Sequence, residues 1–290
     1  MSGVPGRPEA ARRPGTALVT GASSGIGFEY ARRLASLGHD LVLVARRGRR
    51  LALQAKRLRD AHGVRVEEVP ADLSQDGPLA EVAERAGGGD VNLVVNSAAV
   101  NGYGPFAEAD PALLTKVVAL NVTAVMRLSR AALPGMLERG SGALVNVASL
   151  LAFAGSLPPS PGGLPQRTVY GGTKGFVVTF TRTLAAELAG TPVRVQLLCP
   201  GLTATEFHLT RGEEPVPGDA PRVHDSGGMD PADVVTASLA ALRSGETVCV
   251  PGLDAAEAID GLADAERDIR TAAGASLAPR YRDAGGAGCR

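Results

Sequence analysis

The segment 170–174, Tyr-Gly-Gly-Thr-Lys, sets a phenol and an ammonium group four positions apart. On a helix this spacing puts both side chains on one face, about 6 Å apart along the axis. A free tyrosine has a pKa of about 10, and a fixed positive charge nearby favours the phenolate. The pair can therefore donate or accept a proton nearer neutral pH. The same spacing is also common on solvated helix faces, so the rest of the chain decides between these interpretations.

The composition is that of a large globular domain without an unusual partner. The 290 residues, 44% of them hydrophobic, can supply the core of one α/β domain. Thirty basic residues balance thirty acidic ones, so we expect no nucleic-acid partner, and no run approaches the roughly 20 apolar residues of a membrane span. Three cysteines and four histidines lack ligand spacing, so we predict no metal site, reduced thiols and a cytoplasmic location.

Short apolar runs alternate with longer helical patterns along the chain. The runs predict seven strands, at 16–20, 40–45, 64–69, 91–96, 142–147, 193–198 and 247–250. Four of them are nearly continuous in apolar character, which is typical of parallel strands covered by helices on both faces. We therefore predict a single-domain, Rossmann-like, doubly wound parallel β-sheet. Its domain is expected to span 16–270, between a disordered tail at 1–15 and a flexible tail at 271–290.

Two segments interrupt this alternation, and both follow the carboxyl ends of predicted strands. Residues 155–167 hold four prolines and three glycines, so they should form a loop just before Tyr170. Residues 205–230 mix prolines with charges of both signs. Open α/β sheets bind ligands at these strand ends, so a lid role is reasonable for each segment, and we predict a lid at about 205–230. A surface insertion is the alternative for both.

A glycine-rich segment, Thr20 to Gly27, follows the first strand and leads into a helical pattern at 28–37. Its glycines at 21, 25 and 27 permit a tight turn and a close backbone approach, and amides at the helix start can bind a pyrophosphate. The G-x-x-x-G-x-G spacing predicts a dinucleotide or phosphate binder. A turn that only connects strand to helix is the alternative.

The second strand is followed by a run of arginines at 46, 47, 49 and 50. A cofactor with a free ribose 2′-hydroxyl would usually meet an Asp or Glu here, and no acid is present. The guanidinium of Arg46 suits a 2′-phosphate, with Arg47 as a possible helper, which favours NADP(H) over NAD(H). Arg49 and Arg50 are expected to be solvated. A nucleic-acid patch is disfavoured because no aromatic residues are interleaved.

Together, the glycine loop and the Tyr/Lys pair resemble the short-chain dehydrogenase/reductase superfamily, from Thr16 to Gly252. Asp72 resembles the family's adenine contact, segment 96–99 its Asn-Asn-Ala-Gly motif, and segment 199–205 the Pro-Gly stretch that holds the nicotinamide. Ala99 in place of the family's glycine adds a methyl near the cofactor. The resemblance implies the strand order 3-2-1-4-5-6-7. It also implies that the following residues bind the cofactor: Gly21, Ser23, Ser24, Gly25, Ile26, Gly27, Arg46, Arg47, Asp72, Leu73, Asn96, Ala98, Tyr170, Lys174, Pro200, Gly201, Thr203 and Thr205.

The same resemblance implies a catalytic tetrad of Asn121, Ser149, Tyr170 and Lys174. Tyr170 would be the general acid or base, and Ser149 would hydrogen-bond the reacting oxygen. Lys174 would lower the pKa of the phenol and bind the nicotinamide ribose, and Asn121 would hold a water that links Lys174 to solvent. Ser156 is a rival to Ser149, which we prefer because it directly follows a strand. Donors at that oxygen stabilise the alkoxide charge as it develops.

These features predict an NADPH-dependent ketoreductase or alcohol dehydrogenase acting on a small-molecule carbonyl or alcohol. The resemblance also implies a homodimer or homotetramer. The alternatives are a non-catalytic, cofactor-binding regulatory protein, and an isomerase or dehydratase of the same superfamily. Only 3% of the residues are aromatic, so we expect a pocket built mainly of aliphatic side chains. The apolar candidates at its mouth are Phe153, Leu157, Leu164, Leu202, Phe207 and Leu209, and His208 is expected to be a solvated loop residue or a substrate contact.

Overall fold

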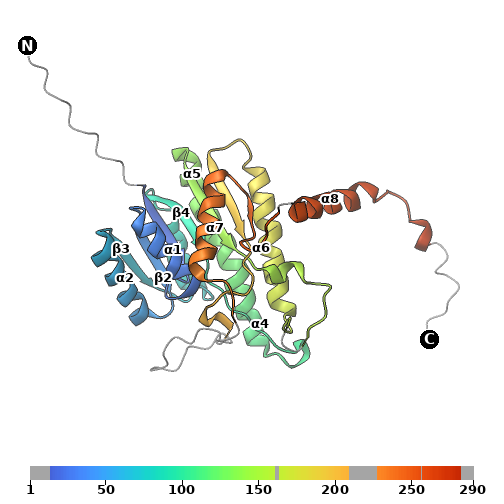
Figure 1. Cartoon of the computed structure of the whole chain (residues 1–290), viewed down its shortest axis with the longest axis horizontal. Coiled ribbons are helices and arrows are strands. Elements are labelled where there is room, and N and C mark those ends of the chain that lie inside the picture. The colour runs from blue at the N-terminus through green and yellow to red at the C-terminus, as the bar shows by residue number, and fades with distance from the viewer. Residues whose placement is uncertain (1–13, 161–162, 209–226, 256, 282–290) are drawn as a thin grey trace, which may run out of the picture. The chain divides into compact units, whose positions relative to one another are not determined.

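A seven-stranded parallel sheet forms the centre of the protein (Figure 1). The computed structural model describes residues 14–160, 163–208, 227–255 and 257–281. The strand order is β3-β2-β1-β4-β5-β6-β7, which confirms the predicted doubly wound arrangement. The strands are β1 (Thr16–Thr20), β2 (Asp40–Ala45), β3 (Val66–Pro70), β4 (Val91–Asn96), β5 (Gly142–Val147), β6 (Val193–Leu198) and β7 (Val248–Cys249).

The helices α1 to α7 lie between these strands in the sequence, as crossover connections require, and α8 follows β7. They are α1 (Gly25–Ser36), α2 (Gly48–His62), α3 (Asp76–Ala86), α4 (Pro111–Val118), α5 (Ala124–Arg139), α6 (Thr168–Glu187), α7 (Pro231–Ser244) and α8 (Glu257–Ala272). The first helix begins three residues before the predicted start, because the glycine loop itself enters the first helical turn. β3 begins two residues later than predicted, because the left-handed Gly63 ends α2 at φ 65° and the chain needs residues to become extended.

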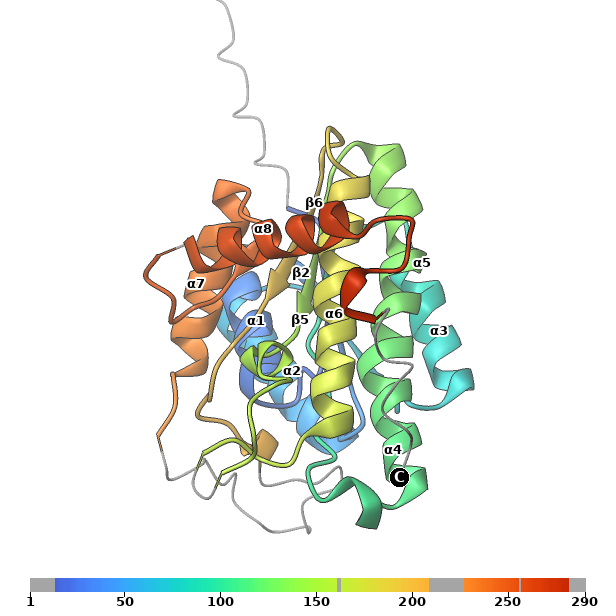
Figure 2. The ribbon, with the colours of Figure 1, turned by 90° about the vertical axis from the view of Figure 1, so that its right-hand side faces the viewer.

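Helices cover both faces of the sheet (Figure 2). Residues of α1, α2 and α7 pack in one apolar cluster, and residues of α3 and α5 pack in another. Neighbouring residues of β1 alternate between the clusters: Ala17 and Val19 join the first, and Leu18 joins the second. This alternation follows from the two-residue period of a strand, and it explains why the central strands are apolar throughout.

The helical run Pro111–Arg139 joins α4 to α5 through a π turn at Ala119–Thr123. By its length of 29 residues and its apolar composition alone, this run could cross a membrane. In the structure its residues Leu128, Ala132 and Met136 are buried in the core cluster beneath the sheet. One face of the run therefore packs in the core of this domain.

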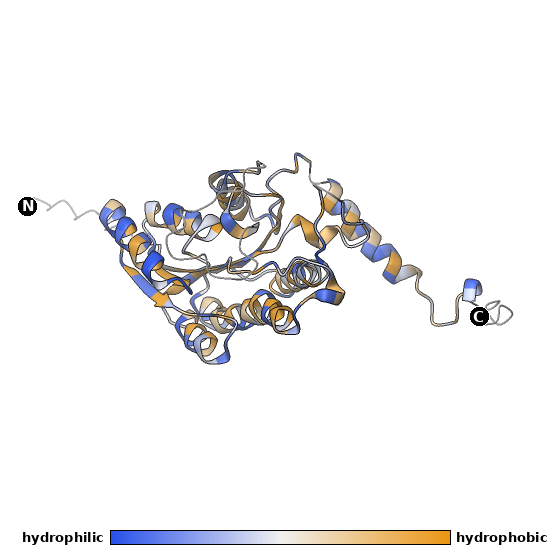
Figure 3. Ribbon diagram, turned by 90° about the horizontal axis from the view of Figure 1, so that it is seen from below, coloured by the Kyte–Doolittle hydropathy of each residue, from blue (hydrophilic) through white to orange (hydrophobic). Residues whose placement is uncertain are grey.

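The chain divides into two compact units, one up to Pro251 and one from Gly252. The second unit contains α8, in which hydrophilic and hydrophobic residues are interspersed along the helix (Figure 3). None of its residues is buried, and Ile269 is 74% exposed. The predicted domain limits of 16–270 stay a prediction. Most of the predicted lid, and the predicted tails except 14–15 and 271–281, lie outside the described residues.

Candidate active site

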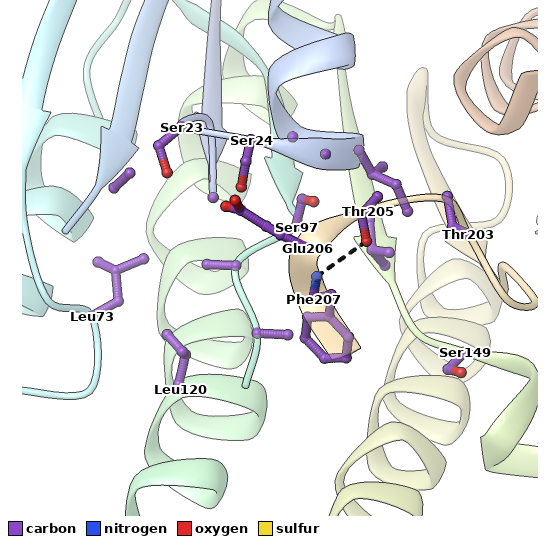
Figure 4. Close-up of a pocket in the computed structure, with 18 of the residues that line it drawn as sticks. Ser23, Ser24, Leu73, Ser97, Leu120, Ser149, Thr203, Thr205, Glu206 and Phe207 are labelled. Carbon is purple, nitrogen blue, oxygen red and sulfur yellow. Dashed lines mark hydrogen bonds between the residues drawn. The ribbon is translucent and has the colours of Figure 1, made fainter. Parts of the chain in front are cut away.

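One pocket opens at the carboxyl ends of the central strands, and it collects nearly all of the predicted site residues (Figure 4). Every predicted site residue lines it except Asn96 and Asn121. Eleven further lining residues were not predicted to bind the cofactor or catalyse the reaction: Val44, Ala45, Ala71, Ser97, Ala99, Tyr103, Leu120, Val147, Ala148, Glu206 and Phe207. This edge of an open α/β sheet is where such folds bind their ligands.

The glycine loop forms the floor at one end of the pocket. Gly21 has φ 69°, and a Cβ there would lie 3.1 Å from the backbone of Ala98. A Cβ on Gly27 would lie 2.5 Å from the carbonyl oxygen of Gly21, too close for any side chain. The loop leads into the amino terminus of α1, where exposed amides favour an anion. The residues therefore fit a phosphate group held against the backbone.

The arginines after β2 flank this loop. Arg47 donates to the hydroxyl of Ser23 at 2.9 Å and to that of Ser24 at 2.7 Å. Arg50, expected to be solvated, instead forms an ion pair with Glu206 at 2.9 Å, because the segment after β6 comes close to the start of α2. Burial would raise the pKa of Asp72, but hydrogen bonds from Ser74 and the charge of Arg46 lower it overall. Asp72 is thus an ionised acceptor.

Tyr170 and Lys174 lie on α6 and form the other end of the pocket. Both are buried, with 5% and 3% of their surfaces exposed. The Nζ of Lys174 is 5.7 Å from the centre of the Tyr170 ring, so the four-residue spacing does place the two groups together. Lys174 also donates to the carbonyl oxygen of Val147, the last residue of β5, at 2.7 Å. This bond fixes the ammonium group at the strand edge.

Ser149 follows β5 and caps a 3-10 turn at Leu150–Phe153. Its hydroxyl accepts from the amide of Leu151 at 3.2 Å, and it lies near enough to the phenol of Tyr170 to lower the pKa of that group in part. The rival Ser156 is exposed in the loop and does not line the pocket. The geometry therefore brings Ser149, and not Ser156, to the tyrosine.

The pKa of Tyr170 differs in direction from the sequence expectation. Burial is the largest cause and raises the pKa of the phenol; Tyr103 raises it further, while the hydrogen bond with Ser149 lowers it in part. Burial also lowers the pKa of Lys174 to about 8. The ammonium charge that was expected to lower the tyrosine pKa is therefore itself disfavoured by the same apolar surroundings. The sequence could not show this burial.

Two aromatic side chains enclose Tyr170. Its ring centre lies 5.3 Å from that of Tyr103, in an edge-to-face arrangement, and 5.8 Å from that of Phe207. These three rings are the aromatic members of the pocket lining, whose other described residues are non-aromatic, so aromatic surface is concentrated around Tyr170. Phe207 was expected at the mouth, but Tyr103 was missed. A signal existed: Tyr103 stands between Gly102 and Gly104, in the loop that follows β4.

The two predicted site residues outside the pocket lie behind it. Asn121 is fully buried in the π turn, accepts from the amide of Val100 at 3.0 Å, and donates to its carbonyl at 2.9 Å and to Thr173 at 3.1 Å. Asn96 donates to Asn146 at 2.8 Å across β4 and β5. Their roles toward water and cofactor stay predictions, and their observed side-chain contacts brace the backbone beneath the pocket.

The segment 155–167 is a loop where the structure describes it, as its prolines predicted. Arg167, which precedes α6, is 7% exposed and donates to the carbonyl oxygens of Pro165 at 3.0 Å and Leu157 at 2.9 Å. It also donates to the carbonyl of Ala154. One buried guanidinium thus fastens both ends of the loop ahead of Tyr170. Among the described residues, no group of three or more His, Cys, Asp and Glu side chains has metal-binding geometry.

Comparison with known proteins agrees with this geometry. The short chain dehydrogenase family model matches residues 15–215. Galactitol 2-dehydrogenase (L-tagatose-forming) of Cereibacter sphaeroides is 37% identical over 199 residues, 69% of this chain and 75% of that protein. The structure of a short-chain dehydrogenase from Sphingobium yanoikuyae in complex with NADPH matches with a TM-score of 0.82 and 34% identity, covering 92% of this chain and 100% of that one.

A second solved structure, the bulky-bulky ketone specific alcohol dehydrogenase from Comamonas testosteroni, matches with a TM-score of 0.80 and 33% identity. It covers 93% of this chain and 99% of that chain. The fold, the glycine loop and the matched family segment all lead to the same assignment. The chain belongs to the short-chain dehydrogenase/reductase superfamily of oxidoreductases.

Proposed function

We propose that this protein is an NADPH-dependent ketoreductase or alcohol dehydrogenase that uses Tyr170 as its general acid or base. The observation that carries the proposal is the cluster of Ser149, Tyr170 and Lys174 at one end of a pocket whose other end is the glycine loop. A cofactor held along this pocket would bring its nicotinamide to the tyrosine. The intact cluster is the reason to prefer an enzyme over a cofactor-binding regulatory protein.

The cofactor proposal rests on the residues at the glycine-loop end. Gly21 and Gly27 let the loop pack closely against the backbone of Ala98 and of Gly21 itself, which a Cβ would prevent, and the amino terminus of α1 suits a diphosphate. Arg46 lines the pocket after β2, where NAD-dependent relatives of this fold carry an acid. A 2′-phosphate is better matched by a guanidinium, which supports NADP(H). The similar Sphingobium yanoikuyae enzyme was solved in complex with NADPH, which agrees with this choice.

When bound, the cofactor supplies or accepts the hydride. Residues of the chain then transfer the proton and hydrogen-bond the reacting oxygen. The Ser149 hydroxyl and the Tyr170 phenol both belong to the pocket lining, and both could hydrogen-bond a carbonyl oxygen there and stabilise charge that develops on it. The raised pKa of Tyr170 keeps the phenol protonated and ready to donate in the reducing direction. Lys174, fixed by Val147, stands behind the ring as the nearby cation.

The substrate is proposed to be a bulky apolar ketone or the corresponding secondary alcohol. Tyr103 and Phe207 present aromatic surfaces beside Tyr170. Outside them, large apolar side chains lie exposed: Leu150, Phe153, Leu157 and Leu202, between 37% and 53% exposed. Exposed apolar groups gathered on the segments around a site favour an apolar ligand. The name of the similar Comamonas testosteroni enzyme, specific for bulky-bulky ketones, supports this class.

The test is a panel of ketones followed by the absorbance of NADPH, with NADH in parallel, for the wild type and Tyr170→Phe. Loss of the general acid should lower kcat by about 100-fold or more, while NADPH binding persists. Tyr281→Phe, a change at an exposed tyrosine outside the pocket, is the matched control. Unchanged turnover in Tyr170→Phe would contradict the proposal. Product formation without net NADPH oxidation would indicate the isomerase or dehydratase alternative.

We also propose a homodimer or homotetramer in the cytoplasm. Met126 and Leu137 of α5 and Phe176 of α6 are large apolar residues that stay 37–42% exposed, and Phe176 stacks on Phe180 at 5.7 Å. Such a surface is suited to a second copy of the chain. Cys199 and Cys249 are buried free thiols, which supports a reducing compartment. Light scattering of the purified protein tests the assembly.

A further inference from the structure

Glu206 reaches across the pocket from the segment after β6 to the glycine loop (Figure 4). It belongs to the 3-10 turn Glu206–His208, far from the loop in sequence. One carboxylate oxygen is 2.5 Å from Nη1 of Arg47, and the other is 2.9 Å from Nη1 of Arg50. The hydroxyl of Ser24 lies beside this carboxylate and lowers its pKa. Two arginines of the cofactor end therefore hold one acidic side chain next to the glycine loop.

Two of these groups, Ser24 and Arg47, are among the residues that the sequence predicts to bind the cofactor. Ser24 is the N-cap of α1, but its side chain makes no capping hydrogen bond, and the first turn of the helix contains no acidic residue. The positive end of this twelve-residue helix favours an anion. Arg47 adds a guanidinium that bonds both Ser23 and Ser24. Glu206 supplies the negative charge that this arrangement attracts.

We propose that Glu206 is an internal competitor for the cofactor: its carboxylate lies at the diphosphate position and must leave before a nicotinamide dinucleotide binds. The inference rests on the proposed function, because it concerns the same pocket. It makes Glu206 a determinant of cofactor affinity and gives it no part in the chemical step.

The charge on Glu206 persists at neutral pH. Burial would raise the pKa of its carboxyl, but hydrogen bonds from Ser24, Arg47 and Arg50 outweigh burial and lower that pKa. Two anions cannot share Arg47 and Ser24 without repulsion. Only molecules in which Glu206 has left the arginines can bind the cofactor. The apparent Kd of the cofactor therefore equals its intrinsic Kd divided by the fraction of such molecules.

The backbone near Glu206 is anchored, so we expect the side chain to move while the segment stays. The amide of Phe207 donates to the hydroxyl of Thr205 at 3.3 Å, and its carbonyl accepts from Asn101 at 2.9 Å. The carboxylate stands on a side chain with rotatable bonds and can swing out of the pocket. The cost of its departure is the loss of its contacts with the two arginines.

The experiment measures the Kd of NADPH and of NADH by calorimetry for the wild type, Glu206→Gln and Glu206→Ala. Both variants should bind both nucleotides about tenfold more tightly, because the diphosphate is common to them. The salt dependence should also change. In the wild type, cofactor binding replaces the Arg47–Glu206 ion pair by a pair between Arg47 and the cofactor. In the variants Arg47 has no Glu206 to lose, so binding forms a new ion pair. The affinity of the variants for the cofactor should therefore fall more steeply with salt concentration.

The control is Glu68→Gln, which removes a carboxylate from another arginine pair, Arg59–Glu68 at 2.7 Å, outside the pocket. Its affinities should match the wild type. Thermal unfolding checks that all variants are folded. Unchanged or weaker binding of the nucleotides by the Glu206 variants would overturn the inference. Failure of the wild type and the variants alike to bind either nucleotide would instead contradict the proposed function.

Discussion

The side-chain amide of Asn101 donates a 2.9 Å hydrogen bond to the backbone carbonyl oxygen of Phe207. Asn101 follows β4 and is fully buried, and Phe207 follows β6, so the bond joins two loops that are far apart in sequence. Phe207 in turn lies against the ring of Tyr170. This bond is therefore one of the contacts that hold one wall of the proposed substrate site.

Replacing Asn101 by Ala should loosen that wall. The change leaves the buried carbonyl of Phe207 without this donor and should lower the free energy of unfolding by about 1–3 kcal/mol. Because Phe207 borders the site, the KM for a bulky ketone should rise more than kcat falls. Steady-state kinetics and chemical denaturation measure the two effects. Asn92→Ala, at the amino end of β4, is the control; an equal rise in KM for both variants would contradict the assignment.

Arg167→Lys tests how the 155–167 loop is held. Lysine keeps the charge but has no planar fork, so it cannot reproduce the three bonds to Ala154, Leu157 and Pro165. We expect a loss of about 2–3 kcal/mol in unfolding free energy and faster amide exchange in the loop. Hydrogen exchange read by mass spectrometry locates the change. Protection that stays at the wild-type level across the loop would show that its own backbone holds it.

Asn96→Ala separates a core role from a cofactor role. In the structure Asn96 donates to Asn146 and to Ser129, behind the pocket. Removing it should lower the unfolding free energy by about 1–3 kcal/mol and leave the Kd of NADPH within about twofold. Chemical denaturation measures the unfolding free energy, and calorimetry measures the Kd of NADPH. A weaker NADPH complex at unchanged stability would favour the cofactor contact that the sequence predicted.

Lys174→Met should reveal the buried ammonium through the pH dependence of stability. Burial lowers the pKa of Lys174 from its ordinary value of 10.5 to about 8. Between these values the unfolded chain holds a proton that the folded protein has released, so stability rises with pH in this window. Relative to the Met variant, the wild type should gain about 1 kcal/mol by about pH 9. A stability difference that is flat between pH 7 and about 10 would show that the lysine titrates normally.

Much of this architecture could be predicted because it depends on local patterns. The strand order was implied by the motifs around Gly21 and Tyr170, and the lining of the pocket followed from their place at strand ends. The parts that were missed depend on long-range contacts. Glu206 and Arg50 are 156 positions apart, and no local pattern joins them. The pKa of Tyr170 likewise depends on Tyr103, which reaches it from another loop.

The π turn at Ala119–Thr123 also sets the rotational phase of a helix. A π turn holds an extra residue compared with an α-helical turn, and each residue of an α-helix rotates the chain by about 100°. Deleting one residue here would leave a regular helix but turn α5 by that angle relative to α4. Either Leu128 and Ala132 would then rotate out of the core, or Asn121 would lose its hydrogen bond with the amide of Val100. The extra residue allows one 29-residue helix to keep both ends in register with the sheet.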